Sequence, residues 1–196
     1  MEGDIQVDCT FGHRGVALGE MRRPFHRGKV YVIAGPNGAG KSTLLQTIAG
    51  ELEPVTGTVR IGDTDPASRA GAGSVARVAD PVFLPDLTVG EHLKLLASHG
   101  TFDYEDVVQH WGLEALVASM PAWISSGQRQ RVFLAAHLNG TEPVLVMDEP
   151  ERHLDTEWCA FLCGELRARA DRGAAVLVAT HSDEVRAAGD EVVTLS

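Results

Sequence analysis

Apolar and helical patterns alternate along most of the chain. Short apolar runs are typical of strands buried on both faces, and the expected strands are 29–34, 143–147, 175–179 and 191–195. Helices are expected between them, at 42–48, 128–138, 155–171 and from Ser182. Buried strands that alternate with helices predict an α/β fold, in which helices cover both faces of a mostly parallel sheet.

Two parts of the chain differ from this pattern. Residues 4–11 and 57–61 alternate apolar and polar positions, which predicts strands of an N-terminal antiparallel part. Residues 85–124 have helical periodicity, with one helix carrying Val89, Leu93, Leu96 and Ala97 on one face and two more near 103–111 and 113–118. The chain is expected to be a single domain, with residues 1–84 and 125–196 as its core and 85–124 as a helical insert.

A glycine-rich loop carries the strongest chemical signal. The sequence 35-GPNGAGKS-42 fits G-x-x-x-x-G-K-[ST] and stands between an expected strand and an expected helix, the setting that supports phosphate binding. Glycines let backbone N–H groups turn inward, while Lys41 reaches the β- and γ-phosphates and Ser42 offers its hydroxyl to Mg²⁺. The nucleotide-binding residues are expected to be Gly35, Pro36, Asn37, Gly38, Ala39, Gly40, Lys41, Ser42 and Thr43.

Polar side chains also follow two later strands. The strand in 144-VLVMDEP-150 ends in Asp148, placed to hold Mg²⁺, and Glu149, placed to polarise the attacking water. A pair of solvent-facing acids is the alternative. His181 follows the strand at 175–179, on the side where ligands bind in open α/β sheets. A lone histidine there is more often structural, but its neighbours favour a contact with the γ-phosphate or its water.

The stretch 123-WISSGQRQRV-132 has two interpretations. Ser125 and Gln128 have the spacing of a capping box at a helix start. The small residues between them also suit an anion site, because a helix N-terminus attracts negative charge. The stretch alone does not decide between a cap and a binding site.

Composition and charge narrow the function classes. The 196 residues are 44% hydrophobic with a formal net charge of −10, which argues against broad nucleic-acid contact. No apolar run approaches the ~20 residues of a membrane helix, and the acidic N-terminus lacks an export signal, so a cytoplasmic protein without its own span is expected. The three cysteines lack metal-site spacing and are expected to be reduced. The basic stretch 22–29 is expected to be a solvated turn. A face toward anionic lipid or a partner is the less favoured interpretation.

In this order, the motifs resemble the ATP-binding subunit of ABC proteins over nearly the whole chain. The resemblance identifies 124-ISSGQ-128 as the family signature, 152-RHLD-155 as the D-loop, His181 as the switch histidine and 85-PDLTVGEHL-93 as the entry to the helical subdomain. It implies ATP and Mg²⁺ as ligands and a head-to-tail dimer with two ATPs between the subunits. The partner's ATP would then meet Ser125, Ser126, Gly127, Gln128 and the D-loop residue Asp155.

The chain departs from the family pattern at two places. Ser126 stands where the family usually has the first glycine of its signature. The family also places a glutamine at the end of the strand in 74-SVARVADPVF-83, touching Mg²⁺ and the attacking water, and this stretch has none. Strand alternation puts Asp80 at that place, whereas alignment from Pro81 puts Ala79 there. Asp80 could hold a metal-bound water and Ala79 could not, so the departure bears on hydrolysis and coupling.

Aromatic residues give further expectations. In the family, an aromatic residue of the first β segment stacks on adenine, and Phe11 stands at about the right distance before Gly35. A core position for Phe11 is the alternative, with His13 and Tyr31 as weaker candidates for the adenine contact. The residues expected to anchor the core are Trp111 and Trp123.

The resemblance implies the nucleotide-binding subunit of an ABC transporter. It would work at the inner face of the cell membrane, pair with a second such subunit as a homodimer or heterodimer, and bind a separate permease through the helical insert. A sequence that ends just past the last strand is more like those of compact exporters than of importers. The alternative is a soluble ABC ATPase that acts as a switch in a cytosolic assembly. A degenerate ATP-binding scaffold is a third class, against which Glu149 and His181 argue.

Overall fold

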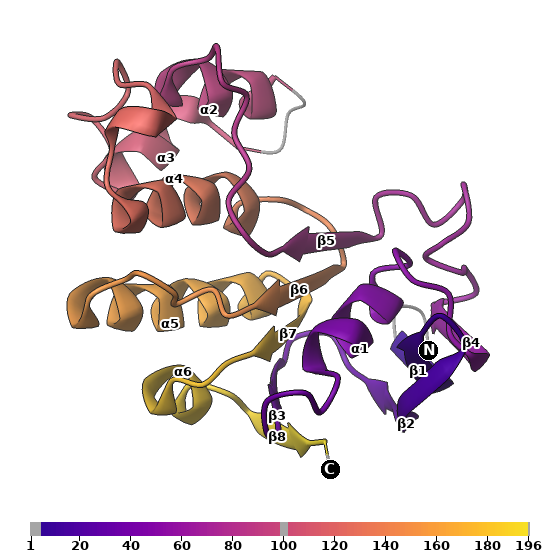
Figure 1. The fold of residues 1–196 in the computed structure, drawn as a ribbon. Coiled ribbons are helices and arrows are strands. Elements are labelled where there is room, and N and C mark those ends of the chain that lie inside the picture. Colours follow the sequence, from indigo (N-terminus) through magenta and orange to yellow (C-terminus); the bar gives the residue numbers. More distant parts are fainter. Residues whose placement is uncertain (1–4, 99–101, 196) are drawn as a thin grey trace.

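Two β-sheets organise the fold (Figure 1). The structure, a computed structural model, describes residues 5–98 and 102–195, so the predicted strand residue 4 lies outside it. The small sheet is antiparallel, with β1 (Ile5–His13) between β2 (Val16–Phe25) and β4 (Thr56–Ile61). The large sheet is parallel, in the order β5-β6-β7-β3-β8. Its strands are β3 (Val30–Ala34), β5 (Val75–Val78), β6 (Val144–Asp148), β7 (Ala175–Ala179) and β8 (Glu191–Thr194).

Helices cover both faces of the large sheet, as the sequence predicts. α1 (Lys41–Ile48) lies between the two sheets, whereas α5 (Thr156–Asp171) and α6 (Asp183–Ala187) lie on the opposite face (Figure 1). Each of these helices begins within one residue of its expected start.

The strands of the large sheet are buried on both sides. In β6, Val144 and Val146 enter the core shared with α1, and Leu145 and Met147 enter the core shared with α5. Because both faces of the sheet are covered, consecutive residues of the strand are apolar and no polar residues alternate with them. This burial explains why the sequence shows the strand as a continuous apolar run.

A helical part lies beyond the edge strand β5 (Figure 1). It contains α2 (Val89–Ala97), α3 (Tyr104–His110) and a 3₁₀ turn (Pro121–Trp123) that leads into α4 (Ser126–Leu138). The prediction of a helix at 113–118 is wrong, because residues 114–118 form turns. At the end of this segment, the carbonyl oxygens of Val117 and Ser119 accept hydrogen bonds from α2. The donors are the N–H groups of Gly90 and Val89, respectively.

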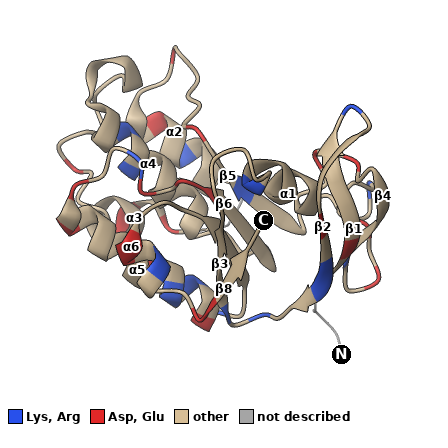
Figure 2. Cartoon of the chain, turned by 60° about the horizontal axis from the view of Figure 1, so that its bottom comes forward, with Lys and Arg blue, Asp and Glu red and all other residues tan. Residues whose placement is uncertain are grey.

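The strand β2 is a second difference from the sequence analysis. Arg22 and Arg23 belong to this strand, whose end is among the blue segments of Figure 2. The turn predicted for the stretch 22–29 is therefore limited to its second half, where Arg27 and Gly28 form a turn. Arg23 pairs with Glu191 at 2.8 Å. β2 is the edge of its sheet and buries only Met21 and Phe25, so its apolar pattern is too sparse to mark a strand.

The two tryptophans expected in the core have different environments. Trp111 is 1% exposed and packs with Trp158, but Trp123 is 80% exposed. Ile124, the next residue, is buried in its place. Among the helices of the described residues, none combines the length and the apolar character needed to cross a membrane.

Candidate functional site

The loop between β3 and α1 forms the first part of the site. Gly38 and Gly40 have φ angles of 83° and 87°, a conformation that costs glycine little. Lys41 begins α1, is 8% exposed, and its Nζ donates to the carbonyl oxygens of Gly35 at 2.9 Å and Pro36 at 3.1 Å. An ammonium group and the N-terminus of a helix meet at this loop, which favours an anionic ligand.

A cavity of about 300 Å³ gathers residues from distant parts of the chain. Ser42 of α1 faces it together with Asp148 and Glu149 at the end of β6. Asp80 and Ala79, the two positions considered for the missing glutamine, both line it as well. The remaining lining residues are Pro81, Gln130, Arg152 and His153. The hydroxyl and carboxylates expected to act together are thus brought to one space.

The two predicted catalytic side chains lie side by side at the ends of neighbouring strands. Glu149 has a φ of 48°, and its N–H donates to the carbonyl oxygen of Ala179 at 2.8 Å, which ties the end of β6 to the end of β7. Its carboxylate lies 3.7 Å from Nε2 of His181 and 3.9 Å from Nε of Arg152. Both Glu149 and His181 are open to solvent, so a ligand can reach them.

Two polar residues that the sequence analysis missed, Gln130 and Glu151, hold the segments around Glu149 and His181 in place. Gln130 is 2% exposed and donates from Nε2 to the carbonyl oxygen of Pro150 at 2.8 Å. Glu151 accepts from the hydroxyl of Thr180 and from the N–H of His181. A signal for Gln130 was available, because it lies four residues before the apolar Leu134 and therefore on the inward face of its helix.

A second cavity, of about 340 Å³, is lined by the whole stretch Ser125–Gln128 and by the D-loop from His153 to Asp155. The predicted capping box is present: Oγ of Ser125 accepts from the N–H of Gln128 at 3.1 Å, and Oε1 of Gln128 accepts from the N–H of Ser125 at 2.9 Å. Asp155 caps α5 by accepting from the N–H of Trp158 at 2.9 Å. Two helix N-termini therefore meet at this cavity.

Gly127 fixes how closely the signature approaches the D-loop. A Cβ atom at this position would lie 2.6 Å from the carbonyl oxygen of His153, closer than packed atoms can come. Ser126, which replaces the usual glycine, lines the same cavity without such a constraint. The structure therefore requires glycine at the second position of the pair and accepts serine at the first.

Phe11 does not have the position expected for an adenine contact. It is 1% exposed, and its ring lies against Gly19 and Gly40, where a Cβ atom would come within 2.6 Å and 2.8 Å of the ring. A ring covered in this way has no free face for stacking, so the stacking prediction is wrong and the core alternative is correct. Tyr31 is also fully buried, whereas His13 is exposed at the end of β1.

Comparison with known proteins identifies the family. The sequence profile of ABC transporters matches residues 18–152, more than half of the chain. The chain belongs to the ABC transporter family. The fold class and the resemblance predicted from the motifs are thereby confirmed, and the chain is an ATPase of the ABC type.

Individual ABC proteins agree with this assignment. The cytochrome c biogenesis ATP-binding export protein CcmA of Rhodobacter capsulatus is 36% identical over 157 residues, which cover 80% of this chain and 70% of that protein. The SkfA peptide export ATP-binding protein SkfE of Bacillus subtilis is 32% identical over 166 residues, covering 81% and 70%. A solved structure of an ATP-binding subunit of an ABC transporter superposes with a TM-score of 0.87 at 26% identity, covering 98% of this chain and 85% of that one.

Proposed function

We propose that this chain is the ATP-hydrolysing subunit of an export-type ABC transporter. It works at the cytoplasmic face of the membrane, with a second nucleotide-binding subunit and a separate permease. The observation that carries the proposal is the cavity that gathers Ser42, Asp148 and Glu149 beside the phosphate loop. The direction of transport is supported by the relatives, since CcmA and SkfE are both named as export proteins.

The residues of this cavity fit Mg²⁺ together with ATP. Mg²⁺ takes one or two protein oxygens, with phosphates and water completing its shell, and Ser42 and Asp148 offer such oxygens from two sides of one cavity. The bound ion would neutralise charge on the β- and γ-phosphates. Asp80 lines the same cavity and would reach the ion through water. Lys41 would exchange its carbonyl partners for phosphate oxygens.

Glu149 and His181 would carry the hydrolytic step. The Glu149 carboxylate would accept a proton from the attacking water as the water oxygen bonds to the γ-phosphorus. The bond from that phosphorus to the oxygen bridging to the β-phosphate breaks, and ADP is the leaving group. The imidazole of His181, 3.7 Å from that carboxylate, would orient the water and the phosphate. His13, exposed at the end of β1, is the remaining aromatic candidate for the adenine contact.

The signature would serve the ATP of a second subunit. Within the described part of the chain, the cavity of Ser125 and the cavity of Ser42 have His153 as their one common lining residue, so the two would be separate sites within one chain. A head-to-tail pair of chains would place one site against the other, with two ATPs between the subunits. ATP would then hold the dimer closed, and hydrolysis would release it.

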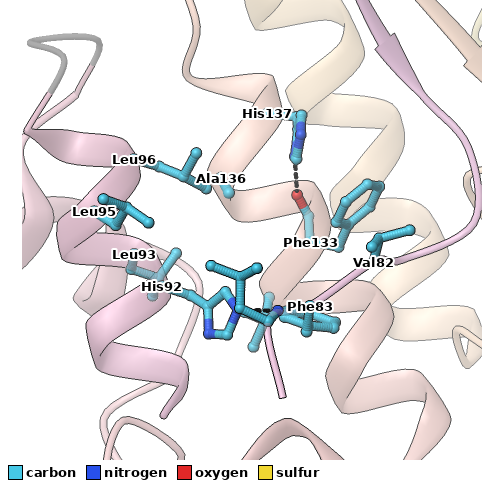
Figure 3. Close-up of a pocket in the computed structure, with 11 residues that line it drawn as sticks. Val82, Phe83, His92, Leu93, Leu95, Leu96, Phe133, Ala136 and His137 are labelled. Carbon is cyan, nitrogen blue, oxygen red and sulfur yellow. Dashed lines mark hydrogen bonds between the residues drawn. The ribbon is translucent and has the colours of Figure 1, made fainter. Parts of the chain in front are cut away.

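An apolar groove between α2 and α4 is the proposed docking site for the permease (Figure 3). It has a volume of about 320 Å³, and the linker that follows β5 supplies Val82, Phe83 and Leu84 to it. Val82 is 79% exposed and Leu84 is 53% exposed. Exposed apolar surface of this kind marks interaction sites, and an amphipathic helix of the permease would lay its apolar face here. The helical insert at 85–124 would thus contribute α2 to the docking unit, and the linker and α4 would contribute the rest.

Hydrolysis by the purified chain tests the enzymatic part of this proposal. We expect Glu149→Gln to bind Mg·ATP as the wild type does and to lose at least about 100-fold in turnover, because the general base is gone. Turnover that survives in Glu149→Gln would contradict the role of Glu149.

Co-purification from the native membrane tests the transport part. We expect a polytopic membrane protein in stoichiometric amount with the wild type, and its loss in Val82→Asp, which puts a charge in the groove. Val192→Asp is the matched control, because Val192 is 40% exposed on β8 and does not line the groove. Recovery of soluble partners alone would instead favour the cytosolic switch.

A further inference from the structure

Arg152 lies between two carboxylates of the nucleotide cavity. Its Nη1 is 3.5 Å from Oδ1 of Asp80, and its Nε is 3.9 Å from Oε2 of Glu149. The three residues come from two segments, since Asp80 follows β5 and the other two follow β6. One guanidinium group therefore connects the proposed general base to the linker after β5.

The backbone directs this side chain toward Glu149. The N–H of Arg152 donates to the carbonyl oxygen of Glu149 at 3.1 Å, which closes a turn directly after the strand. Glu149 and His153, at the two ends of this segment, both have left-handed φ angles, of 48° and 67°. Such angles are uncommon for residues other than glycine. The turn brings the side chain of residue 152 back over residue 149.

The carboxylates of the cavity explain why a cation at position 152 matters. Asp80, Asp148 and Glu149 contribute carboxylates to the cavity wall, and Arg152 is the single Lys or Arg among its lining residues in the described part of the chain. Like charges that share one site repel each other. A cation between two of them reduces the repulsion and fixes where each carboxylate lies.

The linker from residue 79 to residue 84 touches both the cavity and the groove. Its first half, Ala79 to Pro81, lines the cavity, and its second half, Val82 to Leu84, lines the apolar groove. Movement of the linker by an occupant of the groove would therefore shift Asp80. The guanidinium group of Arg152 would carry that shift to Glu149.

We propose that Arg152 is a positioning residue, which links Glu149 to the linker through Asp80 in a chain that has no glutamine at this place. The inference rests on the proposed ATPase and adds a route by which the groove controls its general base. In this role Asp80 acts through Arg152, and its carboxylate sets the position of Glu149.

A double-mutant cycle on turnover tests the link. We expect Arg152→Gln to lower kcat about 10-fold with the KM for ATP within about 3-fold, because Arg152 has no proposed contact with the nucleotide or its metal ion. Asp80→Asn should lower kcat about 10-fold as well, but its KM is not a test of the link, since Asp80 would also reach Mg²⁺ through water. The double variant should also lose about 10-fold, since linked residues are not additive. Arg152→Lys should lose less than Arg152→Gln, because it keeps the charge, but it should not reach wild-type turnover, because an ammonium group lacks the fork that faces both carboxylates. Arg77→Gln, which breaks the 2.6 Å pair with Glu51 outside the cavity, is the control with unchanged turnover.

Two results would overturn the proposal: wild-type turnover in Arg152→Gln, or a double variant that loses the about 100-fold expected of independent sites. Absence of turnover in the wild type would count against the proposed ATPase and not against the link. Amide hydrogen exchange of residues 79–84 therefore gives a second answer that is independent of turnover. We expect faster exchange, to the same extent, in both single variants and the double variant; unchanged exchange in Arg152→Gln would also overturn the link.

Discussion

At the scale of single residues, Lys41 is a side chain whose present partners a phosphate can replace. Its Nζ bonds two neutral carbonyl oxygens of the phosphate loop. A phosphate oxygen carries charge, and hydrogen bonds between charged groups are the stronger ones. The position of the ammonium group therefore suits a site that is prepared for ATP.

We expect Lys41→Ala to weaken ATP binding about 10- to 100-fold, because one charged hydrogen bond of about 1.5–3 kcal/mol is lost. Calorimetric titration of the variant with Mg·ATP measures this change. The matching circular dichroism spectrum should be that of the wild type, since Lys41 bonds only its own loop among the hydrogen bonds of the described residues. Equal affinity in the two proteins would contradict the assignment.

At the scale of elements, two helices begin with the same capping box. In α2, Thr88 and Glu91 bond each other's backbone N–H groups, and in α4 Ser125 and Gln128 do the same. Only the second box lines the signature cavity. The stretch that had two interpretations in the sequence is thus shown to be a cap, and its anion-binding role can be separated from capping by experiment.

The two capping boxes allow a prediction that separates capping from anion binding. Ser125→Ala and Thr88→Ala should each cost about 1 kcal/mol of stability, since each removes one cap. Only Ser125→Ala should weaken the ATP-dependent dimer, because its hydroxyl would also bond the partner's phosphate. Thermal unfolding and sedimentation of both variants measure the two effects. Equal dimerisation by the two variants would leave Ser125 as a cap alone.

Another prediction concerns Asp190, whose carboxylate binds the first residue of β3. Asp190 accepts from the N–H of Val30 at 2.7 Å and pairs with Arg167 at 2.7 Å. The N–H of Val30, and then Arg167, hold the pKa of the Asp190 carboxyl below its usual value. A lowered pKa in the folded state means that this stabilisation is complete above the unfolded pKa, about 3.9, and is lost as the pH falls further.

We therefore expect Asp190→Asn to lower the free energy of unfolding at pH 7 by about 1 kcal/mol, a modest figure because the pair is partly exposed. The difference from the wild type should shrink below about pH 4. Denaturant unfolding at several pH values measures it. Asp63→Asn, which changes an exposed acid after β4, is the control and should show neither effect. The account would be contradicted if the free energies of unfolding of Asp190→Asn and the wild type differed by the same amount at every pH.

How much the sequence predicts also depends on the element. The strands of the large sheet and α1 are predictable, because double burial and the phosphate loop leave strong patterns. The strand β2 is not, since an edge strand that buries only Met21 and Phe25 has little periodicity. Trp123 and Phe11 show a limit for single side chains. Trp123 is predicted in the core and is exposed, whereas Phe11 is predicted against adenine and its ring is buried.

At the scale of the whole molecule, the proposed function gives the chain two different halves of a nucleotide site. The phosphate loop and Glu149 belong to one half, and the signature and Asp155 belong to the other. In the proposed account, each ATP needs the phosphate loop of one chain and the signature of another. The central claim is therefore that ATP joins two copies, or two related subunits, head to tail.

Sedimentation velocity of the Glu149→Gln variant tests this claim most directly, because ATP stays bound when turnover is blocked. We predict a monomer without nucleotide and with Mg·ADP, and a dimer with Mg·ATP. A variant that binds Mg·ATP and remains a monomer at every concentration would contradict a homodimer held by ATP. If adding the second nucleotide-binding subunit also produced no dimer, the account of the signature would be wrong.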